Sequence, residues 1–92
     1  MNIVRQAVAG SLESSDILVT LAPGAGELEI ILTSSVENYY GDAIRETMRR
    51  TLAELGVTSA RVEAVDHGAL DCTIRARLTT AVRRACREED GK

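Results

Sequence analysis

The chain has 92 residues, 45% of them hydrophobic and 27% charged, which is typical of one small soluble domain with a modest core. A net charge of −3 and an aromatic content of 2% argue against nucleic-acid binding, because phosphate contacts need excess Lys and Arg and base stacking needs aromatic rings. No segment approaches the ~20 apolar residues that cross a bilayer, and no signal peptide is visible, so we expect a cytoplasmic protein that binds no membrane.

The first part of the chain is expected to form three β-strands. Residues 4–9 are expected to form the first strand, and residues 16–22 the second, with Ile17, Val19 and Leu21 on one face. Residues 27–33 have the period of two of a half-buried strand. The sequence Pro23-Gly24-Ala25-Gly26 between the last two is a strong turn signal. Because short connections join all three strands, we expect them to form an antiparallel meander.

The pattern then changes to a helical period. Apolar residues recur every three or four positions, as on one face of a helix, at Tyr40, Ile44, Met48, Leu52 and Leu55. The start of this helix is open between two positions: Ser34-x-x-Glu37 fits a capping box, but Gly41 would interrupt a helix that began there, so we place the helix at residues 42–55. Glu46 and Arg50 on it have the i,i+4 spacing of an ordinary ion pair.

A fourth strand and a second helix complete the chain. Residues 59–65 alternate again, and a second helical stripe follows at Leu70, Ile74, Leu78, Ala81 or Val82, and Ala85. The order βββαβα predicts an α+β fold, a small mostly antiparallel sheet covered on one face by two helices. We expect residues 1–92 to form a single domain with a frayed tail at 88–92.

Several reactive or charged side chains have ordinary interpretations. Cys72 and Cys86 belong to no Cys/His cluster, so we expect free thiols and no metal site. His67, in the turn before the second helix, is expected to be a surface or capping residue. The last helix carries five arginines, and we favour a solvated face paired with acids over a docking surface for an acidic partner or phosphates; they are Arg75, Arg77, Arg83, Arg84 and Arg87.

The loop between the first two strands is the best candidate for chemistry, and it contains Glu13-Ser14-Ser15-Asp16. A serine on a loop tip can be modified without disturbing a core, although Ser and Asp are also ordinary turn formers. A serine hydroxyl is a poor nucleophile without a base, and the only histidine, His67, lies far along the chain. We therefore expect a serine that another enzyme modifies, and no catalytic residue.

Five segments, in order and with matching spacing, resemble the citrate lyase acyl carrier protein (gamma subunit) family; they are residues 7–16, 34–37, 41–45, 68–72 and 75–78. The resemblance implies that Ser14 carries 2'-(5''-phosphoribosyl)-3'-dephospho-CoA through a phosphodiester. Many relatives have glycine beside this serine, where the chain has Ser15. Register favours Ser14 over Ser15 and Ser11, and only mapping would decide.

The resemblance also implies a non-catalytic carrier subunit in citrate fermentation. The thiol of the arm would hold acetyl and citryl groups as thioesters while citrate is cleaved to oxaloacetate and acetate. The implied partners are the alpha (acyl transferase) and beta (lyase) subunits, the prosthetic-group transferase and an acetate ligase, with no nucleic acid and no membrane. Cys72 and Cys86 need not take part, because the working thiol belongs to the arm.

Three alternatives stay open from the sequence. A malonate decarboxylase carrier uses the same arm and a similar serine loop, although residues 41–45 and 69–72 look more like the citrate lyase version. A citramalate lyase carrier would look the same. The alternative from another class is a non-covalent α+β interaction module without a cofactor.

Overall fold

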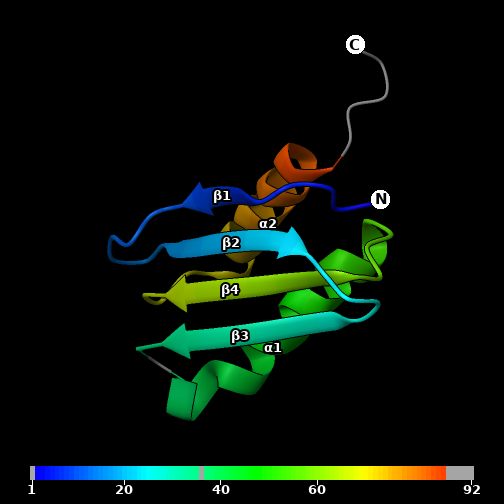
Figure 1. Cartoon of the computed structure of the whole chain (residues 1–92). Helices are drawn as coiled ribbons and strands as arrows, with labels where there is room; N and C mark the ends of the chain where they lie inside the picture. Colours follow the sequence, from blue (N-terminus) through cyan, green and yellow to red (C-terminus); the bar gives the residue numbers. More distant parts are fainter. Residues whose placement is uncertain (1, 36, 87–92) are drawn as a thin grey trace.

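The computed structural model describes residues 2–35 and 37–86, so the tail expected at 88–92 lies outside the described residues. Its elements are β1 (Ala7–Gly10), β2 (Ile17–Pro23), β3 (Leu28–Ser34), α1 (Glu37–Glu54), β4 (Ala60–Asp66) and α2 (Asp71–Ala85). Both helices cover the same face of a four-stranded sheet (Figure 1). The expected α+β fold and its order βββαβα are thereby confirmed.

The expected meander is wrong, because β3 does not pair with β2. The sheet order is β1-β2-β4-β3, in which β4 pairs antiparallel with β2 and parallel with β3. The segment β3-α1-β4 is a β-α-β crossover, which returns the chain parallel to the strand it left. The turn after β2 therefore passes across the start of β4, where a Cβ on Gly24 would lie 2.5 Å from the Ala60 nitrogen.

The first strand is shorter than residues 4–9 and begins at Ala7. The backbone amides of Val4 and Arg5 donate to the Ala85 carbonyl at the end of α2, at 2.9 and 3.2 Å. The last carbonyls of a helix lack partners within the helix. Residues 4 and 5 therefore bind the end of α2 and do not extend the sheet.

At the starts of both helices the structure differs from the prediction made from the apolar stripes. Helix α1 begins at Glu37 and runs through Gly41, which is buried, because tertiary packing can offset the roughly 1 kcal/mol that glycine costs in a helix. Leu70 is the N-cap of α2 and is 69% exposed, and Tyr40 is 59% exposed. The two stripe positions nearest the helix starts therefore lie outside the core.

The core lies between the sheet and the two helices and is aliphatic. Alternate residues of the central strands face it and are fully buried, among them Ile17, Val19, Leu21, Ala60 and Val62. The helices contribute the rest of their stripes at Met48, Leu52, Ile74, Leu78 and Val82. Burying each large aliphatic side chain contributes roughly 1.5–3 kcal/mol, and this packing fixes where the connecting loops meet.

Candidate functional site

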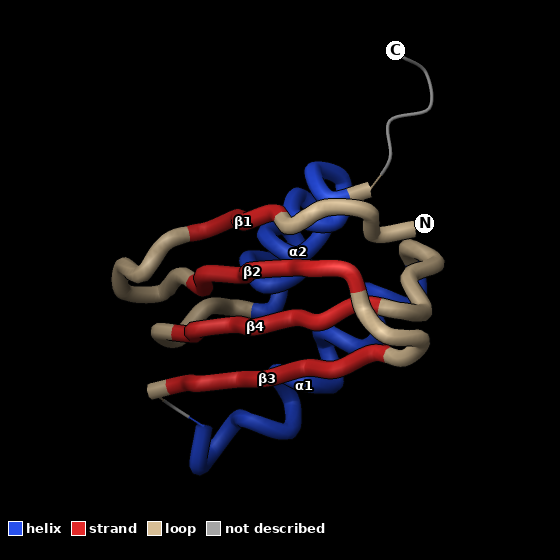
Figure 2. Tube along the Cα trace, in the orientation of Figure 1, coloured by secondary structure: helices blue, strands red, loops and turns tan. Residues whose placement is uncertain are grey.

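Three connections meet at one end of the sheet. The parallel strands β3 and β4 end there, and the antiparallel strand β2 begins there. The loop of residues 11–16, called here the serine loop, therefore lies beside the β4–α2 connection, and the β3–α1 connection lies on the other side of that segment (Figure 2). The sheet topology brings together residues that are 50 positions apart in the sequence.

The serine loop is anchored through Asp16, which is 8% exposed. Arg77 on α2 donates from Nε to Oδ1 and from Nη2 to Oδ2 of this carboxylate, both at 3.0 Å. The Ser11 hydroxyl donates to Oδ2 at 2.6 Å, and the Ile17 amide donates to Oδ1 at 2.7 Å. Both ends of the loop are therefore fixed to one carboxylate, and Arg77 joins the loop to α2.

This network keeps Asp16 ionised. The hydrogen bonds from Arg77, followed by those from Ser11 and Ile17, hold the pKa of Asp16 well below its ordinary value of 3.8. A carboxyl with a lowered pKa in the folded state stabilises the fold above the unfolded-state pKa, and this contribution is lost as the pH falls toward the folded-state pKa. Acid should therefore weaken the anchor of the serine loop only below about pH 4.

We expect Asp16→Asn to lower the melting temperature at pH 7, because the neutral amide loses the charge-assisted bonds from Arg77. The melting temperature should then fall less steeply between pH 5 and pH 3 than that of the wild type. Circular-dichroism melts across this range measure both effects. Asp42→Asn is the matched control, because the Asp42 side chain is fully exposed. If the melting temperatures of Asp16→Asn and the wild type changed with pH in parallel, ionised Asp16 would not be what anchors the serine loop.

The backbone of His67 lies directly against the serine loop. The Ser15 amide donates to the His67 carbonyl at 2.8 Å, and the His67 amide donates to the Asp16 carbonyl at 2.9 Å. His67 is far from the serines along the chain but close to them in the fold, because β2 and β4 are neighbours in the sheet. Among the described residues no hydrogen bond joins its imidazole to a serine of the loop, so its observed role is to hold the loop backbone.

The three serines of the loop have different surroundings. Ser14 is exposed, and within the described part of the chain its hydroxyl has no hydrogen-bond partner. The Ser11 hydroxyl donates to Asp16 and accepts from the Glu13 amide at 3.2 Å. Ser15 has a backbone φ of 65°, in the left-handed region that favours glycine. Ser15 is also exposed, and no hydrogen bond to its hydroxyl occurs among the described residues, so the contacts distinguish Ser14 and Ser15 from Ser11 but not from each other.

The conformation of Ser15 leads to a prediction about loop stability. Ser15→Gly should raise the stability by about 0.5 kcal/mol, because relief of roughly 1–2 kcal/mol of left-handed strain outweighs the added chain entropy of glycine. Ser14→Gly, at a position without positive φ, should lower the stability by a similar amount. Urea unfolding of both variants tests this, and a loss of stability in Ser15→Gly would refute it.

A second buried carboxylate shapes the β4–α2 connection. Asp66 is 1% exposed and accepts hydrogen bonds from the Ser34 hydroxyl at 2.8 Å and from the amides of Gly68 and Ala69 at 3.1 and 3.0 Å. The Ser35 amide donates to the Asp66 carbonyl at 3.2 Å. This residue fixes the path of the segment that supports the serine loop. This role of Asp66 was not predicted from the sequence.

Three arginines of α2 that are described have structural contacts. Arg75 pairs with Glu54 on α1, Arg77 binds Asp16, and the Nη1 atom of Arg84 donates to the Val8 carbonyl at 2.7 Å. Each joins α2 to another element, and the expected pairing with acids is confirmed for Arg75 and Arg77. Arg84 binds a backbone carbonyl instead, and Arg83 is exposed. Arg87 lies outside the described residues.

Two further expectations about single residues are confirmed, the Glu46–Arg50 ion pair and the free cysteines. The Glu46–Arg50 pair forms at 3.5 Å, and both cysteines are free thiols. No cluster of metal-binding side chains occurs among the described residues. Within the same part of the chain, neither helix has the length and apolar character to cross a membrane.

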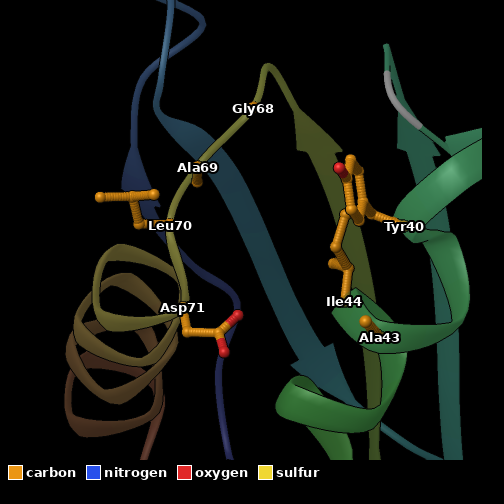
Figure 3. Close-up of a pocket in the computed structure, with 7 residues that line it drawn as sticks. All are labelled: Tyr40, Ala43, Ile44, Gly68, Ala69, Leu70 and Asp71. Atoms are coloured by element: carbon orange, nitrogen blue, oxygen red, sulfur yellow. The ribbon is translucent and has the colours of Figure 1, made fainter.

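A pocket of about 500 Å³ opens between the starts of the two helices. Figure 3 shows Tyr40 and Ile44 of α1 on one side and the carboxylate of Asp71 directed toward them from the start of α2. Its lining is mostly apolar and consists of Tyr40, Ala43, Ile44, Gly68, Ala69, Leu70 and Asp71. Sequence analysis did not find this pocket, because its two walls are more than 20 residues apart in the chain.

Comparison with known proteins identifies the family. An acyl carrier protein family model, described as "Malonate decarboxylase delta subunit (MdcD)", matches residues 4–85. The chain is 56% identical to the citrate lyase acyl carrier protein of Streptococcus mutans, over 97% of this chain and 88% of the relative. It is 54% identical to the corresponding protein of Cronobacter sakazakii, over 94% of this chain and 89% of the relative.

A solved structure has the same fold. One chain of a Pseudomonas malonate decarboxylase hetero-tetramer, crystallised in complex with malonate, superposes with a TM-score of 0.81. The match covers 94% of this chain and 89% of that chain at 24% identity. At this identity the similarity concerns the fold alone.

The family model that matches residues 4–85 places the chain in the class of acyl carrier proteins. The identities of 54–56% over most of the chain place it within this class: the chain belongs to the citrate lyase acyl carrier protein family.

Proposed function

We propose that residues 1–92 form the acyl carrier domain of a citrate lyase, with 2'-(5''-phosphoribosyl)-3'-dephospho-CoA attached to Ser14 through a phosphodiester. The observation that carries this proposal is an exposed Ser14 hydroxyl on a loop with both ends anchored, in a chain of this family. The thiol of the arm supplies the chemistry, holding acetyl and citryl groups as thioesters.

The residues of the serine loop fit such an attachment. A modified serine must be reachable by another enzyme, and its hydroxyl must not be part of the structure. Ser14 satisfies both conditions, whereas the Ser11 hydroxyl is a bonding partner of Asp16. The role of Asp16 and Arg77 is to hold the loop in one conformation for the modifying enzyme. These contacts support Ser14 over Ser11.

The protein itself performs no catalysis in this proposal. Its partners are the alpha subunit, which exchanges acetyl for citrate, the beta subunit, which cleaves the citryl thioester, the prosthetic-group transferase and an acetate ligase, all in the cytoplasm. A tethered substrate reaches successive active sites at high effective concentration, which is the physical advantage of a carrier. An anchored loop gives that tether a fixed origin.

A malonate decarboxylase carrier is the second candidate function. The description of the matching family model and the shared fold with a malonate decarboxylase chain favour it. The relatives at 54–56% identity favour citrate lyase, and at 24% the malonate decarboxylase chain is much more distant. A citramalate lyase carrier differs only in the acyl group. The two lyases and the decarboxylase are distinguished by which large subunits accept the loaded carrier.

The test is co-expression with the prosthetic-group transferase, followed by intact-mass measurement. The proposal expects a mass increase equal to the arm, and then hydroxylamine-sensitive loading of radiolabelled acetate by the acetate ligase. The loaded carrier should support citrate cleavage with the alpha and beta subunits. No mass increase in the presence of an active transferase would refute the carrier function, and support of malonate decarboxylation alone would favour the second candidate.

A further inference from the structure

The pocket between α1 and α2 opens beside the serine loop. The Ser15 amide bonds to the His67 carbonyl, and the next residue, Gly68, lines the pocket. A Cβ placed on Gly68 would meet nothing within 4 Å, so the space that a side chain would occupy at this residue is open. A group attached to Ser14 therefore starts next to the pocket.

We propose that this pocket binds the adenine of the covalent arm, an inference that rests on the proposed function. Along the arm the order from the serine is phosphate, ribose, adenosine, pyrophosphate, pantetheine and thiol. Adenine is the first group on this path with apolar faces. The pocket's position next to the loop favours the near part of the arm over its distant acyl end.

The lining of the pocket matches the chemistry of adenine. Tyr40 is one of only two aromatic residues in the chain, and its side chain is 59% exposed here, where a base can stack on it. Ile44 and Ala69 add apolar surface. Asp71 is directed across the pocket and is an acceptor for the exocyclic amino group of adenine (Figure 3). The volume of about 500 Å³ lies within the range of small-molecule sites.

The same residues disfavour the other parts of the arm. The carboxylate of Asp71 repels phosphates and the free carboxylates of a citryl group. A neutral ring with an amino donor meets no such repulsion. The pocket therefore holds the start of the arm near the serine loop and leaves the pantetheine and its thioester free to reach the large subunits.

The test uses the arm-bearing protein from co-expression with the transferase, with attachment verified by intact mass. We expect nuclear Overhauser effects between the adenine H2 or H8 protons and the Tyr40 ring. Reaction of adenine with chloroacetaldehyde, which needs a free N1 and amino group, should be at least about fivefold slower than in free dephospho-CoA. Both measurements report on adenine and not on turnover.

Variants separate stacking from hydrogen bonding. Tyr40→Phe should keep the slow reaction, whereas Tyr40→Ala and Asp71→Ala, which remove the stacking ring and the acceptor, should bring it close to the rate in free dephospho-CoA. Arg49→Ala, at another exposed position of α1, is the matched control and should leave the rate unchanged. A wild-type protein that bears the arm but reacts at the free rate would overturn the pocket assignment and leave the carrier function standing. Nuclear Overhauser effects from the pantetheine methyl groups to Tyr40 would equally overturn the assignment of adenine to the pocket. Absence of the arm after co-expression would overturn both this assignment and the carrier function.

Discussion

Ser14→Ala should abolish acyl loading while leaving the fold intact. The hydroxyl is the proposed attachment point, and without it the transferase has no oxygen at that position to modify. The side chain is exposed and has no partner among the described residues, so the free energy of unfolding should change by less than about 0.5 kcal/mol. Intact mass after co-expression, acetate loading and a circular-dichroism melt measure the three quantities.

Two neighbouring serines provide the controls. Ser15→Ala and Ser11→Ala should both still receive the arm, and Ser11→Ala should also lower the melting temperature, because its hydroxyl bonds to Asp16 and to the Glu13 amide. Arm attachment that survives in Ser14→Ala and disappears in Ser15→Ala would move the site to Ser15. A large loss of stability in Ser14→Ala would show that the serine is structural.

Gly10→Ala should destabilise the protein by more than about 3 kcal/mol. Gly10 is the last residue of β1, with a backbone φ of +96°, and a Cβ there would lie 1.8 Å from the Ile17 carbonyl oxygen. The backbone must shift to admit a methyl group, and the shift would separate the two ends of the serine loop. Urea unfolding measures the loss of free energy.

Gly26→Ala separates the steric clash of an added Cβ from the strain of a left-handed backbone. Gly26 has a similar φ of +104°, but a Cβ there would meet nothing within 4 Å. Its substitution should cost only the strain of a left-handed residue, roughly 1–2 kcal/mol. If the two variants lost equal stability, the close approach of Gly10 to Ile17 would not be a constraint on the loop.

The sequence was sufficient to predict the secondary structure wherever the pattern of buried residues lies within a single strand or helix. The alternation of residues 27–33 and 59–65 and the spacing of Ile44, Met48 and Leu52 follow from one face of each element being buried. It failed at helix starts, where Tyr40 and Leu70 are exposed, because the apolar stripe continues past the part of the helix that the sheet covers.

The serine loop itself was also recognisable from the sequence. Its position between two strands and its resemblance to a known family pointed to Ser14, and the structure places that residue at an exposed position of a loop. The anchor was not predicted, although a signal existed: Asp16 directly precedes a strand with a fully buried face, and a carboxylate there needs a partner. Which of the arginines of α2 supplied it could not be read from spacing.

Only the tertiary structure decided which segments are neighbours. The apolar pattern of a strand shows which of its faces is buried, but it does not show which strand lies beside it. The position of β4 between β2 and β3 was therefore not predicted. That insertion places His67 against the serine loop, aligns Arg77 with Asp16 and opens the pocket at Tyr40. These contacts join residues tens of positions apart, and they exist because a β-α-β crossover and an antiparallel pairing share one central strand. Local periodicity determined the elements, the resemblance to a known family pointed to Ser14, and the crossover determined what surrounds it.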